Sequence, residues 1–231
     1  MTPSNLKLSW LSALLQTSDA LFPTGAYAHS LGFEEYARLA NVRDESGLRT
    51  FVDEHLFPAL AAQELPYLRF AYAADDFTAL CEIDREISAW KLAREIREAS
   101  TQVGRRRLAA LRVVNDQPRY RELAEAIARS DAYGHHLTVC AVQAVVEGFP
   151  LDAALTAYFY QTIGGVCSAA LKIIRIGQDG CQRVLRHALS SAGETIRTSL
   201  AVERDDAGWF DPLLEIAAMR HEFSNERLFI S

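Results

Sequence analysis

Residues Leu151–Gly177 read LDAALTAYFYQTIGGVCSAALKIIRIG and form the most apolar stretch of the chain. On a helix drawn through them at about 100° per residue, the polar residues fall within a stripe roughly 60° wide. These are Gln161, Ser168, Lys172 and Arg175. Because a helix that is apolar around most of its circumference must be covered on most sides, we expect an all-α fold. It should be a single compact domain of about nine or ten helices around a buried central helix over residues 151–176.

The same stretch raises a membrane alternative, since about 20 apolar residues can cross a bilayer. No Lys or Arg anchors the stretch on its N-terminal side, and Gln161 would lie near mid-span, where a polar side chain is costly. We therefore expect the central helix of a globular protein. A membrane-associated helical protein stays open as an alternative.

Composition bounds the class of protein. The 231 residues are 49% hydrophobic and 23% charged, values typical of a soluble globular protein. The formal net charge of −6 argues against duplex nucleic acid as a partner, because such binders usually need a basic surface. The N-terminal residues MTPSNLKLSW do not resemble a secretory signal. We expect a cytoplasmic protein that binds neither nucleic acid nor membrane.

The four cysteines are scattered along the chain and form no CxxC pair, which predicts neither a zinc site nor a disulfide framework. We expect them to be reduced and mostly buried, as in cytosolic proteins. They are Cys81, Cys140, Cys167 and Cys181.

Helical periodicity runs through the chain, and proline, glycine and capping residues set the expected boundaries. The expected helices run from residue 4 to 19, from 26 to 39, from Asp44 onward with a kink at Pro58, from Pro66 onward, from 77 to 90, from 90 to 114, from Pro118 onward, from Asp131 to Gly148, through the central stretch, onward from a turn at 178–180, and from Pro212 onward. Residues 1–202 would form the helical core domain. Residues 203–231 would form a linker, a short helix and a C-terminal partner-binding tail of the same domain.

The chain shows no motif for self-contained catalysis. It has no nucleophile motif, glycine-rich phosphate loop, HExxH or Glu-x-x-His pair. The adjacent His135 and His136 would point about 100° apart on a helix, which makes them a poor metal pair. In the run Arg105–Arg107 we expect a solvated face and one paired arginine, with Arg107 on the apolar side. The pattern indicates binding, with a helical metal-dependent enzyme as the alternative.

Four stretches, in order, resemble one family. The first, Leu14–Tyr36 (LLQTSDALFPTGAYAHSLGFEEY), follows the pattern Asp, Pro, Gly, aromatic, Ser and Gly-Leu-Glu, with Phe33 in place of the usual Leu. The others are REASTQVGRRRL (97–108), ALKIIRIGQDGCQRVL (170–185) and RHEFSNERLFIS (220–231), where Ile230 replaces the usual Arg. On these stretches the chain resembles the urease accessory protein UreF family, from residue 14 to its last residue.

The resemblance implies an all-α protein that assists nickel insertion into urease in the cytoplasm. It implies a homodimer that bridges the accessory protein UreD, also called UreH, and the GTPase UreG. Such a protein would assist GTP-dependent assembly of the nickel metallocentre on apo-urease and modulate the GTPase without being an enzyme itself. The resemblance implies no catalytic residue and no tightly bound cofactor or metal, because nickel would pass through the complex.

Two groups of residues are candidates for these roles. Partner binding is expected at the signature segment and the tail, namely Tyr27, Ser30, Gly32, Glu34, Tyr36, Arg220, His221, Glu222, Arg227, Leu228 and Phe229. A nickel path or a structural polar role is expected for Lys172, Arg175, Gln178 and Gln182. Surrounded by apolar residues, Lys172 should be buried beside a polar partner. Three apolar residues near the chain end should dock on a partner, so we expect the tail to be mobile in the isolated protein.

Overall fold

The computed structural model describes residues 9–26, 29–224 and 227–230, and these residues form helices and no strands. Two π-helical segments, Val52–Leu56 and Leu60–Glu64, join three α-helices into one rod over residues 45–72. With the rod counted once, the described residues hold ten helices in one domain, which confirms the all-α class. The helices are α1 (Ser9–Ser18), α2 (Phe33–Leu39), α3 (Glu45–Phe51), α4 (Phe57–Ala59), α5 (Leu65–Tyr72), α6 (Phe77–Trp90), α7 (Arg94–Val114), α8 (Pro118–Ala128), α9 (His136–Glu147), α10 (Leu151–Ile173), α11 (Gln178–Leu200) and α12 (Pro212–His221).

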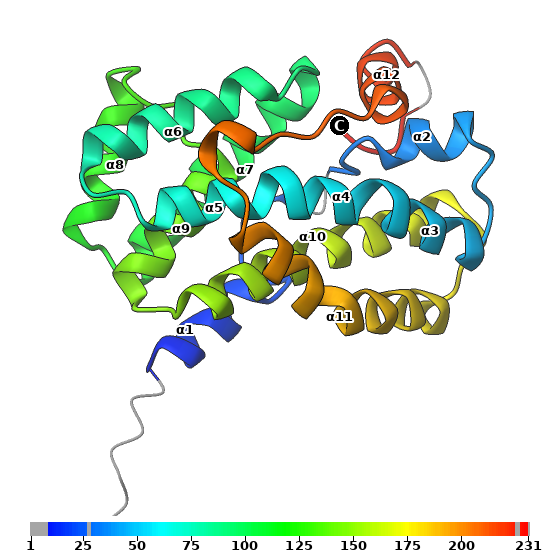
Figure 1. Cartoon of the computed structure of the whole chain (residues 1–231), viewed down its shortest axis with the longest axis horizontal. Helices are drawn as coiled ribbons and strands as arrows, with labels where there is room; N and C mark the ends of the chain where they lie inside the picture. Colours follow the sequence, from blue (N-terminus) through cyan, green and yellow to red (C-terminus); the bar gives the residue numbers. More distant parts are fainter. Residues whose placement is uncertain (1–8, 27–28, 225–226, 231) are drawn as a thin grey trace, which may run out of the picture.

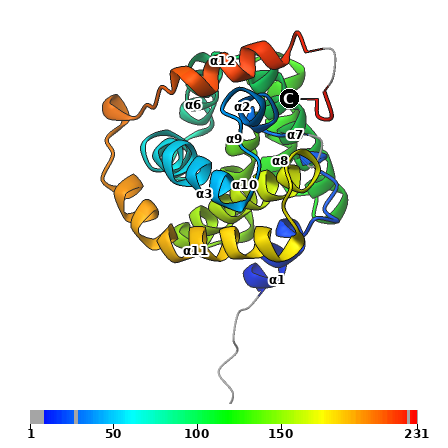
Figure 2. The same ribbon diagram turned by 90° about the vertical axis from the view of Figure 1, so that its right-hand side faces the viewer.

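Helix α10 occupies the centre of the molecule, with α2, α5, α9 and α11 packed around it (Figure 1 and Figure 2). Its inward residues Leu155, Phe159, Ile163 and Val166 have no exposed surface. Each such side chain contributes about 1.5–3 kcal/mol by its removal from water. The helix ends at Ile173, slightly before the expected boundary.

One face of α10 stays uncovered, which the sequence did not predict. Thr156, Tyr160, Ser168 and Lys172 are exposed, and they continue at four-residue intervals through Gly164. The predicted burial of Lys172 is therefore wrong. A helical wheel gives the relative directions of side chains, but it does not say which direction the neighbouring helices leave open.

The rod over residues 45–72 remains helical through two prolines. Asp44 caps its start as expected, because its carboxylate accepts a hydrogen bond from Gly47 N at 3.1 Å. Proline lacks an N–H group, and its ring crowds the carbonyl four residues back. The helix accommodates each proline with a π-helical turn, in which the hydrogen bond spans five residues. Phe57 N donates to Val52 O, and Leu65 N donates to Leu60 O. The helix thus continues at Pro58 and Pro66, where the sequence predicted a kink and a new segment.

Two helix starts differ from expectation. The helix expected over residues 26–39 begins only at Phe33, because Leu31 and Gly32 have positive φ angles of 57° and 82°. The turn expected at 178–180 is the first turn of α11, whose N-cap position is taken by Gly177. Of the first expected helix, residues 4–8 lie outside the described residues.

The expected paired arginine on the apolar side of α7 is confirmed. Arg107 is buried and donates two hydrogen bonds to Gln143 Oε1, at 2.9 and 2.6 Å, while Arg105 and Arg106 are exposed. Its partner is a neutral amide of α9. Arg107 therefore connects α7 to α9 inside the molecule.

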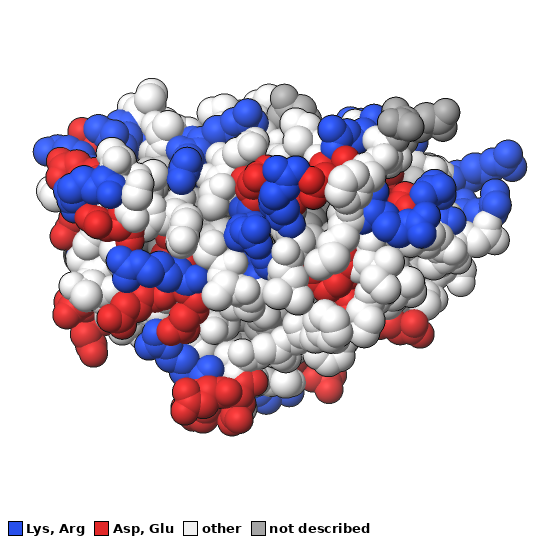
Figure 3. Space-filling view, turned by 90° about the horizontal axis from the view of Figure 1, so that it is seen from above, with Lys and Arg blue, Asp and Glu red and all other residues white. Residues whose placement is uncertain are grey.

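The face that carries α12 shows basic and acidic side chains next to each other, with uncharged surface between the groups (Figure 3). All four cysteines are free, and three of them are buried. Among the described residues, no helix has the length and apolarity required to span a bilayer.

Candidate partner-binding site

The signature segment turns sharply before α2, and this turn lets α12 approach it. Gly32 has a φ of 82°, a left-handed conformation that costs other residues about 1–2 kcal/mol. A Cβ there would lie 3.3 Å from Leu214 Cδ1 and 3.6 Å from Ala218 Cβ, both on α12. The buried Ser30 Oγ accepts a hydrogen bond from Glu34 N at 3.4 Å. The segment therefore packs against its own chain.

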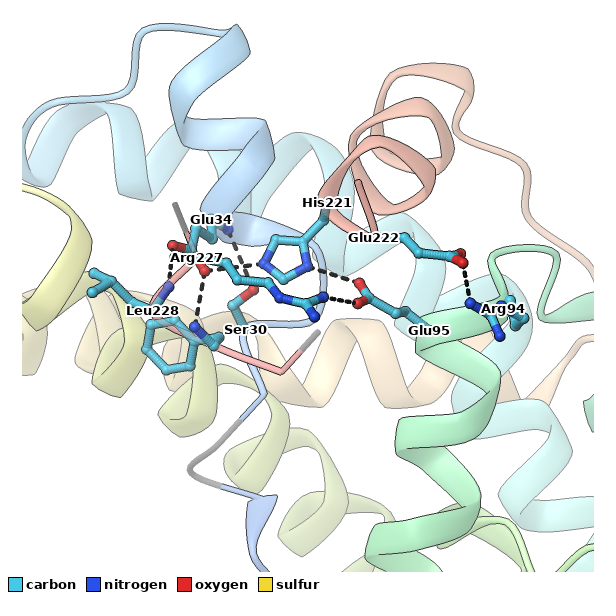
Figure 4. A network of polar contacts seen from close by, with 9 residues as sticks. Ser30, Glu34, Arg94, Glu95, His221, Glu222, Arg227 and Leu228 are labelled. Carbon is cyan, nitrogen blue, oxygen red and sulfur yellow. Dashed lines mark hydrogen bonds and ion pairs between the residues drawn. The ribbon is translucent and has the colours of Figure 1, made fainter. Parts of the chain in front are cut away.

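Glu34, in the first turn of α2, holds the C-terminal segment (Figure 4). Its Oε1 accepts a hydrogen bond from Leu228 N at 2.8 Å, and its Oε2 accepts one from Phe229 N at 3.1 Å. Hydrogen bonds to a charged group typically contribute about 1.5–3 kcal/mol. Phe229 is buried, and Lys172 Nζ lies 5.2 Å from the centre of its ring. Residues 227–230 are thus docked on their own chain, whereas the sequence predicted a mobile tail.

His221 lies between two carboxylates and is only 1% exposed. Its Nε2 is 3.0 Å from Glu34 Oε2, and its Nδ1 is 2.7 Å from Glu95 Oε2. Arg227 Nη1 donates to the other Glu95 oxygen at 2.6 Å. The carboxylates of Glu34 and Glu95 repel each other. The contacts that His221 and Arg227 make with them therefore hold the group together. We call Glu34, Glu95, His221 and Arg227 the Glu34 cluster, which joins α2, α7, α12 and the tail (Figure 4).

Ion pairs flank the Glu34 cluster on both sides. Glu222 pairs with Arg94 at the start of α7 (Figure 4). Glu35, which is buried, pairs with Arg38 and with Arg220, whose Nε lies 3.2 Å from Glu35 Oε1. Arg38 first, and then Arg220, lower the pKa of Glu35 below its ordinary value. The ionised Glu35 therefore ties the end of α12 to α2.

A series of polar contacts from Tyr36 through His55 to Asp211 fixes the start of α12. Tyr36 Oη lies 2.7 Å from His55 Nε2, and His55 Nδ1 contacts Asp211 Oδ2. Asp211 also caps α12, because its other oxygen accepts hydrogen bonds at 3.1 Å from the backbone N–H groups of residues 213 and 214. Burial raises the pKa of Asp211, but the hydrogen bonds from His55 and the backbone outweigh burial and lower it. Both ends of α12 are thus fixed to α2.

Most of the partner-binding residues predicted from the sequence meet in this region. Tyr27 lies outside the described residues. Ser30, Gly32, Tyr36, His221 and Phe229 are buried, whereas Arg220, Arg227 and Leu228 are exposed.

The four residues predicted for a nickel path or a structural polar role are all exposed. Lys172 and Arg175 are exposed near the tail, where Arg175 lines a groove together with Glu34 and Leu228. Gln178 and Gln182 are exposed on α11.

The sequence did not point to Glu95, which supplies the cluster's contacts from α7, or to Arg94, which forms the flanking pair with Glu222. The second stretch that carries the resemblance begins only at Arg97, and no local pattern distinguishes Glu95 or Arg94. Only the fold brings them within reach of His221, Glu222 and Arg227.

Apolar side chains continue from the cluster along α12 and the tail. Phe223 is 80% exposed, Leu228 68% and Ile230 52%. Monomeric proteins rarely leave large contiguous apolar patches in water. We call the exposed residues Phe210, Leu213, Ile216, Met219, Phe223, Leu228 and Ile230 the α12–tail surface.

This fold and site define a helical protein whose C-terminal segment is held by the Glu34 cluster and carries exposed apolar side chains. The profile of the UreF family matches residues 42–189. The chain is 37% identical over 219 residues to a urease accessory protein UreF from Paenarthrobacter aurescens (strain TC1), an alignment that covers 95% of this chain and 97% of the relative.

Two further relatives agree. The chain is 34% identical over 223 residues to the urease accessory protein UreF of Arthrobacter sp. (strain FB24), covering 96% of this chain and 98% of that protein. It is 30% identical over 224 residues to that of Bacillus sp. (strain TB-90), covering 96% and 99%. The chain belongs to the UreF family of urease accessory proteins, which confirms the resemblance.

Proposed function

We propose that this chain is a non-catalytic accessory protein that assists GTP-dependent assembly of the urease nickel metallocentre. It bridges UreD, also called UreH, and the GTPase UreG on apo-urease, modulates the GTPase, and nickel passes through the assembly as cargo. Membership in a family of urease accessory proteins supports this process. The observation that carries the binding role is the exposed α12–tail surface, which the Glu34 cluster fixes in place.

UreD is the partner that we assign to the α12–tail surface. Arg220, Glu222, Arg227 and Leu228 would contact it directly. The partly buried Glu34 and the buried residues Ser30, Gly32, Tyr36, His221 and Phe229 would hold that surface in shape. Burial of two apolar side chains could contribute on the order of 3 kcal/mol before ordering costs. Because the tail is already docked, much of its ordering cost is met before the partner arrives.

Lys172 and Arg175 suit this partner surface better than a nickel path, whereas Gln178 and Gln182 on α11 stay candidates for a nickel path or a structural polar role. Lys172 and Arg175 are exposed cations beside the tail. A positive charge repels a divalent cation, so an ion would not be guided along them. As neighbours of Leu228 and Phe229, they suit contacts with carboxylates of a partner.

The homodimer would form through the uncovered face of α10. Tyr160 and Leu171 are 41% and 40% exposed on this helix, and no atom would meet a Cβ at Gly164 within 4 Å. Tyrosine is enriched at protein interfaces. Light scattering after size-exclusion chromatography should give a dimer for the native chain and a monomer for Gly164→Arg. A variant that stays dimeric contradicts the choice of this face.

The test of the main proposal compares two aspartate substitutions at exposed apolar residues. Leu228→Asp changes the α12–tail surface, whereas Val113→Asp changes α7 at a position that is 86% exposed and outside it. We expect Leu228→Asp to weaken capture by UreD at least tenfold and to lower the nickel content of co-expressed urease. Val113→Asp should leave both unchanged. Equal capture of the two variants would contradict the proposal.

The cytoplasm is the proposed compartment, since free cysteines are typical of it. We propose no nucleic-acid or membrane partner. Membership in the UreF family does not favour the helical enzyme or the membrane-associated protein that the sequence left open.

A further inference from the structure

His136 and Cys140 lie one turn apart on α9, and His136 Nε2 is 3.3 Å from Cys140 Sγ. His136 lines a partly open cavity of about 230 Å³. The cavity wall reaches the surface beside α12, at residues that are themselves exposed. These are Leu31, Leu92 and Trp209.

We propose that His136, at the wall of this cavity, and Cys140, which contacts it, form a binding site for a first-row transition-metal dication. An imidazole nitrogen and a thiolate are the donors that borderline-soft ions such as Ni²⁺, Co²⁺ and Zn²⁺ prefer. Positions four residues apart on a helix point to the same side, so both donors can reach one ion. The adjacent His135 points elsewhere, and its Nδ1 lies 3.1 Å from Ser100 Oγ.

The distance between the two donors fits a shared metal ion. With bonds of about 2.3 Å to sulfur and about 2.05 Å to nitrogen, the donors stand about 3.1 Å apart at a right angle and about 3.6 Å apart at the tetrahedral angle. The observed 3.3 Å lies between these limits. On binding, the thiol proton leaves to solvent, and the thiolate and the neutral imidazole each give an electron pair to the ion. No electron is transferred.

The site should hold its ion weakly and release it readily. Within the described ranges, no three His, Cys, Asp or Glu side chains are placed to hold one metal, so the pair leaves the other coordination positions to water or an incoming donor. The positive charges of Arg107 and Lys91 act on His136 and limit the affinity further. That the ion is Ni²⁺ in transit rests on the proposed function, whereas the metal site itself does not.

Titration of the reduced, full-length protein with Co²⁺ tests the site. We expect near-ultraviolet absorption from sulfur-to-cobalt charge transfer that saturates at about one ion per chain and disappears when Ni²⁺ is added. Cys140→Ser and His136→Gln should lose at least tenfold in affinity. Cys81→Ser, which changes another free cysteine, should behave as the native chain does. Absorption that persists in Cys140→Ser, or is absent from the native chain, would overturn the proposal.

A second measurement needs no substitution and therefore does not depend on the variants folding. Ni²⁺ should slow alkylation of Cys140, read by mass spectrometry, and leave the other three cysteines of the same molecule unchanged. An equal rate with and without Ni²⁺ would mean that the pair is only a hydrogen bond. Leu228→Asp should keep the cobalt absorption, so a failure of partner binding and a failure of the metal site give different results.

Discussion

The carboxylate of Glu34 connects the two ends of the chain. It accepts hydrogen bonds from backbone N–H groups that follow it by 194 and 195 residues, and it also contacts the buried His221. Each of these donors would otherwise need water or another acceptor. A side chain in the first turn of α2 therefore holds the tail backbone, in addition to the Arg227–Glu95 pair and the burial of Phe229.

Replacement of Glu34 by alanine should release the tail while the helices stay folded. Loss of one partner from a buried polar contact typically costs about 1–3 kcal/mol, so tail opening should rise about tenfold or more. Hydrogen exchange at the amides of Leu228 and Phe229 measures this opening. Glu122→Ala, which removes only an exposed ion pair with Arg119, should not change it.

The same Glu34→Ala variant should lower the nickel content of co-expressed urease, because the partner surface loses its fixed shape. Exchange equal to that of the native chain would show that other contacts hold the tail. Normal urease activation would remove Glu34 from the functional residues.

Alanine in place of Lys172 should have a small effect on stability. The ammonium is exposed and lies 5.2 Å from the centre of the Phe229 ring, and exposed cation–π contacts contribute about 0.5–1 kcal/mol. Urea unfolding should therefore show a loss of about 1 kcal/mol or less. A loss several times larger would mean that Lys172 has a buried partner after all.

Among the helices, the sequence predicts an end correctly where a residue at that end caps the helix itself. Asp44 caps α3, and Gly148 ends α9 with a φ of 70°, both as the sequence indicates. Residues 26–32 differ, because the helical pattern of that segment does not show that Leu31 and Gly32 take positive φ angles. The docking of the tail also escaped prediction, since its acceptor lies almost a whole chain length away.

Gly32→Ala should disturb the junction of α2 and α12. The φ of 82° disfavours alanine, and the new methyl group would lie 3.3 Å from Leu214 Cδ1. Together these effects should cost about 1–3 kcal/mol, seen as a lower urea midpoint. Gly193→Ala in α11, where nothing lies within 4 Å of the new Cβ, should stabilise the protein by about 0.5–1 kcal/mol. Similar shifts for both variants would contradict the role of the turn.

At the scale of the whole molecule, the apolar content of residues 151–177 was enough to predict which helix lies at the centre. It could not predict which side of α10 stays open, because that depends on the placement of the helices around it. The candidate site was predicted only in part, because part of it also depends on how the helices pack. The resemblance supplied Glu34, His221 and Arg227, but Glu95 joins them only through tertiary packing.

Global stability should fall in mild acid, and His135 should contribute part of the loss. The ring is fully buried, and no described group bonds to its Nε2. Burial is the main cause that lowers the pKa of His135 to about 4, with Lys91 and Arg105 acting in the same direction and Asp84 and Glu64 opposing it. In the unfolded chain the imidazole has a pKa of about 6.5.

Below pH 6.5 the unfolded state therefore binds a proton that the folded state does not, and stability is lost as the pH falls toward 4. Between pH 7 and pH 5 this one group should remove about 2 kcal/mol from the free energy of unfolding. Urea unfolding at both pH values should show a smaller difference for His135→Gln than for the native chain. His187→Gln, which changes a partly exposed histidine paired with Asp53, should keep the His135 contribution. If His135→Gln loses as much stability between the two pH values as the native chain does, the acid sensitivity comes from other groups.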